Sequence, residues 1–146
     1  MIRIQTEDFD TGAEIAALSK DNAHVGAVAS FIGVVRGDDG LTALTLEHYP
    51  AMTEREIAKI ADEATQRWKL EGVTIIHRTG RLPLGAQVVF VGVASGHRGA
   101  AFEACEFLMD YLKTRAPFWK QEERGTATGW VEAKTSDDAK AARWTK

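Results

Sequence analysis

Residues 113–120, with the sequence KTRAPFWK, place two lysines and an arginine beside two aromatic residues. A lysine that is partly desolvated next to aromatic groups and other cations can donate a proton or act as a nucleophile near neutral pH. The proline in this segment disfavours helical geometry before it, so the chain opens at a helix end and can line a pocket. A plainer interpretation stays open: Lys113 and Arg115 stabilise the negative end of a helix, while Phe118 and Trp119 join the core.

A second candidate site is the pair His97 and Arg98, in the sequence SGHRG between an expected strand and an expected helix. The start of a helix directs free backbone N–H groups and a positive dipole end toward an anion. Arg98 offers a planar fork for a carboxylate or phosphate, and His97 can donate hydrogen bonds or move protons near neutral pH. A solvated turn before a helix is the equally open alternative.

The remaining side chains with chemical potential give weaker signals. Arg36 follows an expected strand and precedes an acidic turn, a position where side chains commonly face a site. Cys105 shares an apolar stripe with its neighbours, which predicts a buried and inert thiol. No metal site is predicted, because the other histidines have no acidic or cysteine partners at metal-ligand spacing and are interpreted as strand or surface residues: His24, His48 and His77.

The composition restricts the class of protein. The chain has 146 residues, of which 45% are hydrophobic and 27% charged, and this fits one globular domain with its own core. The formal charge of −3 gives no overall attraction to nucleic acid or to an anionic membrane. A single cysteine excludes an internal disulfide, and no apolar run approaches the length of a membrane span, so a cytoplasmic protein is expected.

Three helices are expected from apolar periodicity and end signals. The segments 11–22 and 53–68 each begin with a threonine followed three residues later by a glutamate, the pattern of a capping box. The segment 99–116 must end there because of the following proline, and it delivers Lys113 on its last turn.

Runs of β-branched and alternating apolar residues predict the strands, which are expected at 25–35, 41–48, 73–82, 87–94 and 130–134. The strand at 41–48 is expected to lie antiparallel to the one before it, across the turn at 38–40. Consecutive apolar residues at 88–91 suggest burial on both faces of a sheet.

Hairpin-connected strands with packed helices predict an α+β fold, in a single domain of mainly antiparallel strands. This domain is expected to span residues 1–134. Residues 135–146 are expected to form a C-terminal surface tail.

Four long blocks in the same order resemble the large, catalytic subunit family of molybdopterin synthase. They are TLEHYPAMTE at 45–54, TIIHRTGRL at 74–82, VFVGVASGHRGAAFEA at 89–104 and MDYLKTRAPFWKQE at 109–122. The resemblance spans nearly the whole chain and implies a fold of the α/β hammerhead type, which agrees with the α+β order of elements.

The resemblance also implies an activity. Enzymes of this family convert cyclic pyranopterin monophosphate to molybdopterin by adding two dithiolene sulfurs, in molybdenum cofactor biosynthesis. The sulfur arrives on the C-terminal thiocarboxylate of a ubiquitin-like small subunit that ends in Gly-Gly, so no separate cofactor is implied. The expected assembly is a homodimer of large subunits that carries a small subunit at each end, giving a heterotetramer.

Specific residues follow from the same resemblance. Lys113 and Lys120 are the implied catalytic lysines, and Lys120 is expected to return toward the pocket that His97 and Arg98 prepare for an anion. The implied substrate-binding residues are Arg36, His97, Arg98, Lys113, Lys120, Gln121 and Glu122. Val34 stands where the family often has a lysine, and the segment 37–40 is shorter than in many relatives.

Three other functions remain to be separated by experiment. A pterin- or phosphate-binding scaffold would keep the fold without turnover, and an adaptor would only grip the C-terminus of a partner. An unrelated acyl-transfer enzyme would use Cys105 as its nucleophile.

Overall fold

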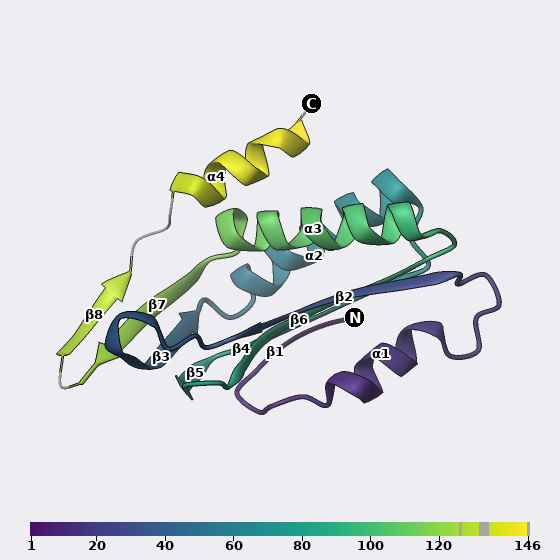
Figure 1. Ribbon diagram of the computed structural model, residues 1–146. Coiled ribbons are helices and arrows are strands. Elements are labelled where there is room, and N and C mark those ends of the chain that lie inside the picture. Colours follow the sequence, from purple (N-terminus) through teal and green to yellow (C-terminus); the bar gives the residue numbers. More distant parts are fainter. Residues whose placement is uncertain (126, 132–134, 146) are drawn as a thin grey trace.

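The computed structural model describes residues 1–125, 127–131 and 135–145, and within them the chain forms two four-stranded sheets with helices packed on the first (Figure 1). The strands are β1 (Ile2–Gln5), β2 (Ala27–Val34), β3 (Leu41–His48), β4 (Gly72–Arg78), β5 (Gly80–Pro83), β6 (Gln87–Ser95), β7 (Phe118–Arg124) and β8 (Ala127–Val131). The helices are α1 (Thr11–Ser19), α2 (Met52–Trp68), α3 (Arg98–Arg115) and α4 (Thr135–Ala142), with 3-10 helices η1 (Asp38–Gly40) and η2 (Arg143–Thr145). The predicted α+β class is confirmed.

The first sheet has the order β1-β4-β6-β2 and is covered on both faces. Only β1 and β4 pair in parallel, while β4–β6 and β6–β2 are antiparallel. Helices α2 and α3 lie on one face and α1 lies on the other (Figure 1). Residues 89–95 of β6 are accordingly all buried, so the predicted burial of this strand on both faces is confirmed.

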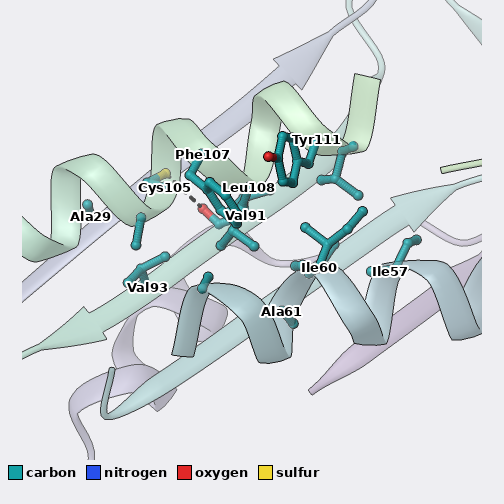
Figure 2. Packing of buried hydrophobic residues seen from close by; sticks show 14 of the residues in the cluster. Ala29, Ile57, Ile60, Ala61, Val91, Val93, Cys105, Phe107, Leu108 and Tyr111 are labelled. Atoms are coloured by element: carbon teal, nitrogen blue, oxygen red, sulfur yellow. Dashed lines mark hydrogen bonds between the residues drawn. The ribbon is translucent and has the colours of Figure 1, made fainter. Parts of the chain in front are cut away.

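The main core lies between α2, α3 and the first sheet (Figure 2). Ile57 and Ile60 of α2 face Val91 and Val93 of β6, and all four side chains are fully buried. Cys105 belongs to this core, where its Sγ lies 4.0 Å from Val91 O, so the predicted burial of the thiol is confirmed. The apolar stripe that contains Cys105 on α3 therefore packs in the core.

The second sheet has the order β5-β3-β7-β8, and it differs from the predicted pairing. The expectation that 41–48 pairs with the preceding strand is wrong, because β2 pairs with β6, whereas β3 pairs with β5 and β7. The turn between β2 and β3 contains Asp39 at φ 55° and Gly40 at φ 73°, and it carries the chain into the other sheet. The expected strand 73–82 likewise divides near Gly80, whose φ is +88°, and its two parts join different sheets.

The starts of two helices also differ from the prediction. The side chain of Asp10 caps α1 by accepting a 3.1 Å hydrogen bond from the Ala13 N–H, so the cap lies one residue before the expected threonine. Helix α2 follows Ala51, and the fully buried Thr53 uses its hydroxyl in tertiary contacts. Both capping-box interpretations are therefore wrong, since the Thr11 hydroxyl donates to Gln87 Oε1 at 2.8 Å and the Thr53 hydroxyl donates to Pro117 O at 3.0 Å.

Residues 135–145 pack on α3, where the sequence suggested a surface tail. Trp144 meets Trp68 and Phe107 edge to face, with ring centroids 5.8 and 5.7 Å apart. The buried Asp110 carboxylate accepts hydrogen bonds from Arg143 at 2.8 Å and from the Trp144 indole at 2.6 Å. These partners lie more than thirty positions away, which is why local patterning did not indicate them. Residues 132–134 lie outside the described residues, so the expected boundary at 134 stays a prediction.

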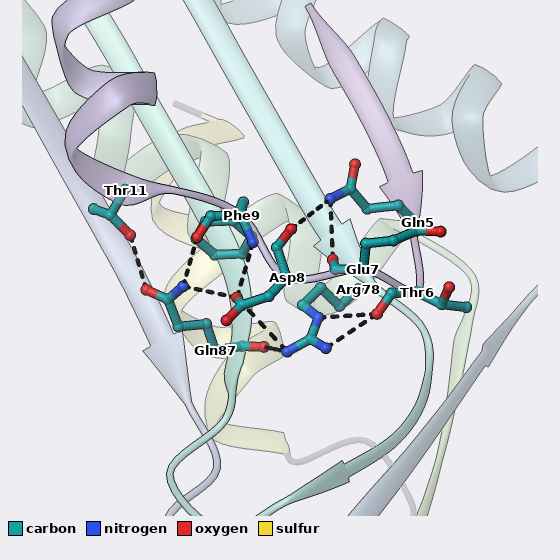
Figure 3. Close-up of polar contacts among 8 residues, drawn as sticks. All are labelled: Gln5, Thr6, Glu7, Asp8, Phe9, Thr11, Arg78 and Gln87. Carbon is teal, nitrogen blue, oxygen red and sulfur yellow. Dashed lines mark hydrogen bonds and ion pairs between the residues drawn. The ribbon is translucent and has the colours of Figure 1, made fainter.

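A polar network joins the segment after β1 to β4 and β6 (Figure 3). The Arg78 guanidinium donates to Thr6 O at 3.0 and 3.2 Å and to Gln87 O at 2.9 Å, and only 14% of its side chain is exposed. The Gln87 amide donates to Asp8 at 2.8 Å and to Phe9 O at 3.0 Å. The Gln87 hydrogen bond is the main cause that lowers the pKa of the Asp8 carboxyl.

None of the described helices is both long enough and apolar enough to cross a membrane.

Replacing Arg78 with alanine should lower the free energy of unfolding by about 2 kcal/mol, because the carbonyl oxygens of Thr6 and Gln87 lose a charged and mostly buried donor. Arg81→Ala is the matched control, since the Arg81 side chain is 60% exposed and its ion pair with Glu123 should contribute less than about 1 kcal/mol. Urea denaturation of both variants measures the difference. Equal losses in the two variants would contradict the structural role of Arg78.

Candidate active site

Lys113 stands on the last turn of α3, as the sequence predicted. The helix ends at Arg115, and Ala116 is extended, with φ −80° and ψ 124°. A tight turn follows, in which the Phe118 N–H donates to Ala116 O at 3.0 Å, and β7 begins at Phe118. The proline thus turns the chain directly from the helix that covers the first sheet into the second sheet.

Thr53 fixes this turn from the side of α2. Its hydroxyl donates to Pro117 O at 3.0 Å and accepts a 3.1 Å hydrogen bond from the Tyr49 N–H. Thr53 is fully buried, so both hydrogen bonds are shielded from water. The start of α2 and the end of β3 are thereby tied to the lysine-bearing segment.

Lys113 lines a cavity of about 420 Å³ between β2, α3 and α4. Phe31, Phe102 and Met109 contribute apolar surface, and Lys140 adds a second ammonium group. The other lining residues are Ala29, Ser30, Cys105, Glu106, Asp110 and Asp137. A cavity of this size with apolar walls and a few charged groups has the character of a small-molecule site.

Lys120 lies in β7 on the same face as Phe118, because alternate residues of a strand face the same side. Its cross-strand neighbour is the buried Leu46 of β3. Glu122 shares this face and forms an ion pair with Arg124, whereas Gln121 faces the opposite side, across from Thr45. The strand thus separates the predicted binding residues, since Lys120 and Glu122 share one face and Gln121 lies on the other.

The ring of Phe118 stacks on His77 of β4, with centroids 3.9 Å apart and planes inclined by 19°. His48 of β3 approaches Phe118 from another side, at 6.3 Å. Burial lowers the pKa of His77 to about 4, and the charge of Lys113 contributes to the lowering. At neutral pH the imidazole is therefore uncharged, although it lies close enough to Lys113 to respond to its charge.

His77 is the site residue that sequence reasoning missed. It was interpreted as a strand or surface residue because it has no acidic or cysteine partner at metal-ligand spacing, and its contact with Phe118 crosses from one sheet to the other. Phe31 and Met109 were also missed as walls of the cavity, because an apolar residue on an amphipathic element has the same pattern in a core and in a pocket.

The predicted anion-binding residues lie elsewhere in the chain. His97 caps the start of α3 and Arg98 is its first residue, so about 22 Å of helix separates Arg98 from Lys113. Both side chains are exposed. The expectation that Lys120 returns toward the pocket prepared by His97 and Arg98 is therefore not met within one chain.

Arg36 follows β2 and is exposed, with its Nε 2.7 Å from Asp38. The register pairs Ala27 with Ser95, so the start of β2, and not the end that carries Arg36, lies beside the His97 loop. Arg36 is thus about 30 Å from His97 along the strand.

Cys105 is a poor nucleophile in this setting. Burial raises the pKa of its thiol to about 11, which leaves almost no thiolate at neutral pH. This disfavours the acyl-transfer alternative. Among the described residues, no three side chains of the metal-ligating types are grouped so as to hold a metal ion.

Comparison with known proteins gives consistent matches over nearly the whole chain. The family model described as "MoaE protein" matches residues 4–115. The molybdopterin synthase catalytic subunit of Mesorhizobium japonicum is 58% identical over 146 residues, which cover 98% of this chain and 92% of that protein.

Solved structures agree with these matches. A structure of molybdopterin cofactor biosynthesis protein E from Burkholderia multivorans aligns with a TM-score of 0.87 and 51% identity, over 100% of this chain and 97% of that one. A complex of subunits 1 and 2 of the molybdopterin-converting factor from Helicobacter pylori aligns with a TM-score of 0.77 over 90% of each chain. At 21% identity this last match concerns the fold alone.

The depressed pKa of His77 predicts a pH dependence of stability. Between about pH 6.5 and pH 4 the unfolded chain binds more protons at this position than the folded chain, so acid favours unfolding. The free energy of unfolding should therefore fall by up to roughly 3 kcal/mol as the pH drops from 6.5 to 4. Urea denaturation across this range measures it. His77→Phe should flatten the dependence, and an unchanged dependence in that variant would contradict the assignment.

Proposed function

Because the chain belongs to the MoaE family, whose members include the catalytic subunits of molybdopterin synthase, we propose how its residues carry out the sulfur transfer of molybdenum cofactor biosynthesis. In this reaction a cyclic pyranopterin monophosphate gains two dithiolene sulfurs and becomes molybdopterin. The observation that carries the proposal is the placement of Lys113 and Lys120 before and after the turn at Pro117, with Lys113 on the wall of a ligand-sized cavity.

Lys113 is the principal catalytic group. Its ammonium stands at the cavity and can stabilise negative charge that develops on the thiocarboxylate carbonyl, then supply a proton to the leaving group. Phe31 and Met109 give the cavity apolar walls beside this ammonium, against which the apolar part of a substrate can pack. Lys120, half-buried on β7, holds the pterin or assists proton transfer, and Glu122 on the same face is a nearby binding residue.

The sulfur donor is the C-terminal thiocarboxylate of a small ubiquitin-like subunit that ends in Gly-Gly. In each transfer the thiocarboxylate sulfur forms a bond to a carbon of the precursor and displaces an oxygen substituent, and water then cleaves the bond between sulfur and the acyl carbon. The sulfur stays on the product, and the donor is left with a carboxylate. The 58% identical relative is named as a catalytic subunit of molybdopterin synthase, and this name supports a second subunit as the partner. Since the donor supplies the sulfur, the reaction needs no cofactor held by this chain.

The separation of the two charged groups supports a homodimer that completes each site. Strand β2 is an edge of its sheet, and Phe31 on β2 and Phe102 on α3 are 41% and 66% exposed. Two copies related by a twofold axis across this face would place the start of one α3 beside the end of the other. His97 and Arg98 of one copy would then bind the phosphate or the released carboxylate beside Lys113 of the other.

Replacing Lys113 with alanine should lower the rate of molybdopterin formation at least 100-fold, because the charge on the transition state loses its main stabilising group. Lys120→Ala should raise the KM for the pterin precursor more than it lowers kcat. The assay combines the purified chain with thiocarboxylated small subunit and precursor, with detection of the product by mass spectrometry. Lys59→Ala is the control, since Lys59 is exposed on α2 and pairs with Glu56.

The same assay separates the remaining alternatives. Near-normal turnover by Lys113→Ala would overturn the catalytic assignment. Binding of precursor without product would favour a scaffold, and binding of the small subunit without affinity for precursor would favour an adaptor.

Mixed dimers test whether the site is shared. Co-expression of Lys113→Ala and Arg98→Ala chains should recover about a quarter of the wild-type rate, since half of the dimers are mixed and each of these holds one intact site. Co-expression of Lys113→Ala with Lys120→Ala is the control and should give only the mean rate of the two variants assayed alone, because both lysines belong to the same end of one chain and no mixed dimer gains an intact site. If the rate of each co-expressed pair only equalled the mean rate of its two variants assayed alone, the shared site would be contradicted.

A further inference from the structure

We propose that His77 is the positioning residue of the lysine pair, because its ring holds Phe118 and thereby fixes the segment that joins Lys113 to Lys120. The inference rests on the proposed function and deepens it. It concerns a residue of β4 that is not among the lining residues of the cavity and whose ring stacks on Phe118 of the lysine-bearing strand.

The contact between His77 and Phe118 differs from the other aromatic contacts. At 3.9 Å and 19°, it is the closest and most nearly parallel ring pair in the part of the chain that the structure describes. The Phe9–Phe90 pair, in comparison, has centroids 6.0 Å apart and planes inclined by 57°. Two flat rings at van der Waals distance restrict each other's sliding and tilting, so Phe118 has little freedom at the start of β7.

His77 itself is held on a rigid support. Its Nδ1 lies 3.0 Å from Arg78 O, which fits a neutral imidazole that donates from Nδ1. Strand β4 lies between β1 and β6, and the preceding residues Ile75 and Ile76 are fully buried. The Arg78 side chain is in turn fixed to Thr6 O and Gln87 O (Figure 3). The ring is therefore anchored to the central part of the first sheet.

This anchor acts together with Thr53 on the turn at Pro117. Thr53 binds Pro117 O from α2, and His77 packs on Phe118 from β4. The turn is thus held from two elements, and both lysines are close to it in sequence, Lys113 before the turn and Lys120 after it. Movement of Phe118 would shift both lysines, and a displacement of about 1 Å can cost a reaction a factor of 10².

The neutral state of the ring suits this role. Desolvation by burial, with smaller contributions from Lys113 and His48, keeps the pKa of His77 well below neutrality. A cationic ring at this place would repel the ammonium of Lys113. A neutral ring supports the segment without adding charge. An aromatic residue that does not titrate should therefore be able to take its place.

Three substitutions separate the ring from its hydrogen bond. His77→Phe keeps the ring, His77→Asn keeps a donor that can reach Arg78 O, and His77→Ala keeps neither. We expect His77→Phe to retain kcat within about threefold, while His77→Asn and His77→Ala lower kcat by roughly 10- to 100-fold with little change in the KM for precursor. Full retention of kcat by His77→Ala, or a loss in His77→Phe equal to that in His77→Ala, would overturn the proposal.

Two controls separate positioning from general destabilisation. Phe9→Ala removes an aromatic contact on the α1 side of the first sheet, and it should lower the melting temperature while leaving kcat unchanged. Phe118→Leu should reduce kcat, and adding His77→Ala to it should reduce kcat little further, because both changes remove one contact. If the double variant lost kcat by the product of the two single fold losses, the two residues would not act through one shared contact.

A measurement that needs no turnover keeps the proposal distinct from the proposed function. The imidazole nitrogen resonances of His77 should show a neutral ring protonated at Nδ1 from pH 8 to pH 5. A ring that titrates near pH 6.5 would overturn the positioning role whatever the activity. Absence of molybdopterin formation by the wild-type chain would instead overturn the proposed function, and the resonances would still report on the stack.

Discussion

The turn at Pro117 is the constraint on which the arrangement of the site depends. Because proline cannot continue α3, the chain leaves the helix that covers the first sheet and enters β7 in the second sheet within three residues. The same turn places a lysine on the last helical turn and another on the first residues of a strand. Thr53 and His77 hold the turn from two other elements, so the fold positions the lysines through tertiary contacts and not through local sequence alone.

Electrostatics and packing act together around this turn. The lysines lie beside aromatic rings and a neutral imidazole, and the acidic groups that line the cavity include Asp110, which is already bound by Arg143 and Trp144. The C-terminal residues therefore have two effects: they complete the core against Trp68 and Phe107, and they occupy a carboxylate that would otherwise compete for Lys113. A segment that looked like a polar tail thus contributes to the charge balance of the cavity.

What the sequence predicted and what it missed follow from the range of the interactions involved. The three helices at 11–22, 53–68 and 99–116 and the end of α3 before the proline depend on spacing within one segment, and the structure has them within a few residues. The pairing of β3, the division near Gly80 and the tertiary role of Thr53 depend on partners remote in sequence. His77 belongs to the second group, since its importance arises from a ring on another sheet.

The length of α3 explains why one chain places its charged groups at two ends. An 18-residue helix is about 27 Å long, so the start that is predicted to bind an anion and the end that carries Lys113 are held at opposite ends of one rigid helix. No side-chain movement closes that distance, so a phosphate bound at Arg98 cannot belong to a substrate that reacts at Lys113 of the same chain. The proposed twofold axis would resolve the conflict without any change of conformation, because it would set the two ends of neighbouring helices side by side. The same rigidity that prevents a site within one chain would then give each shared site a fixed geometry.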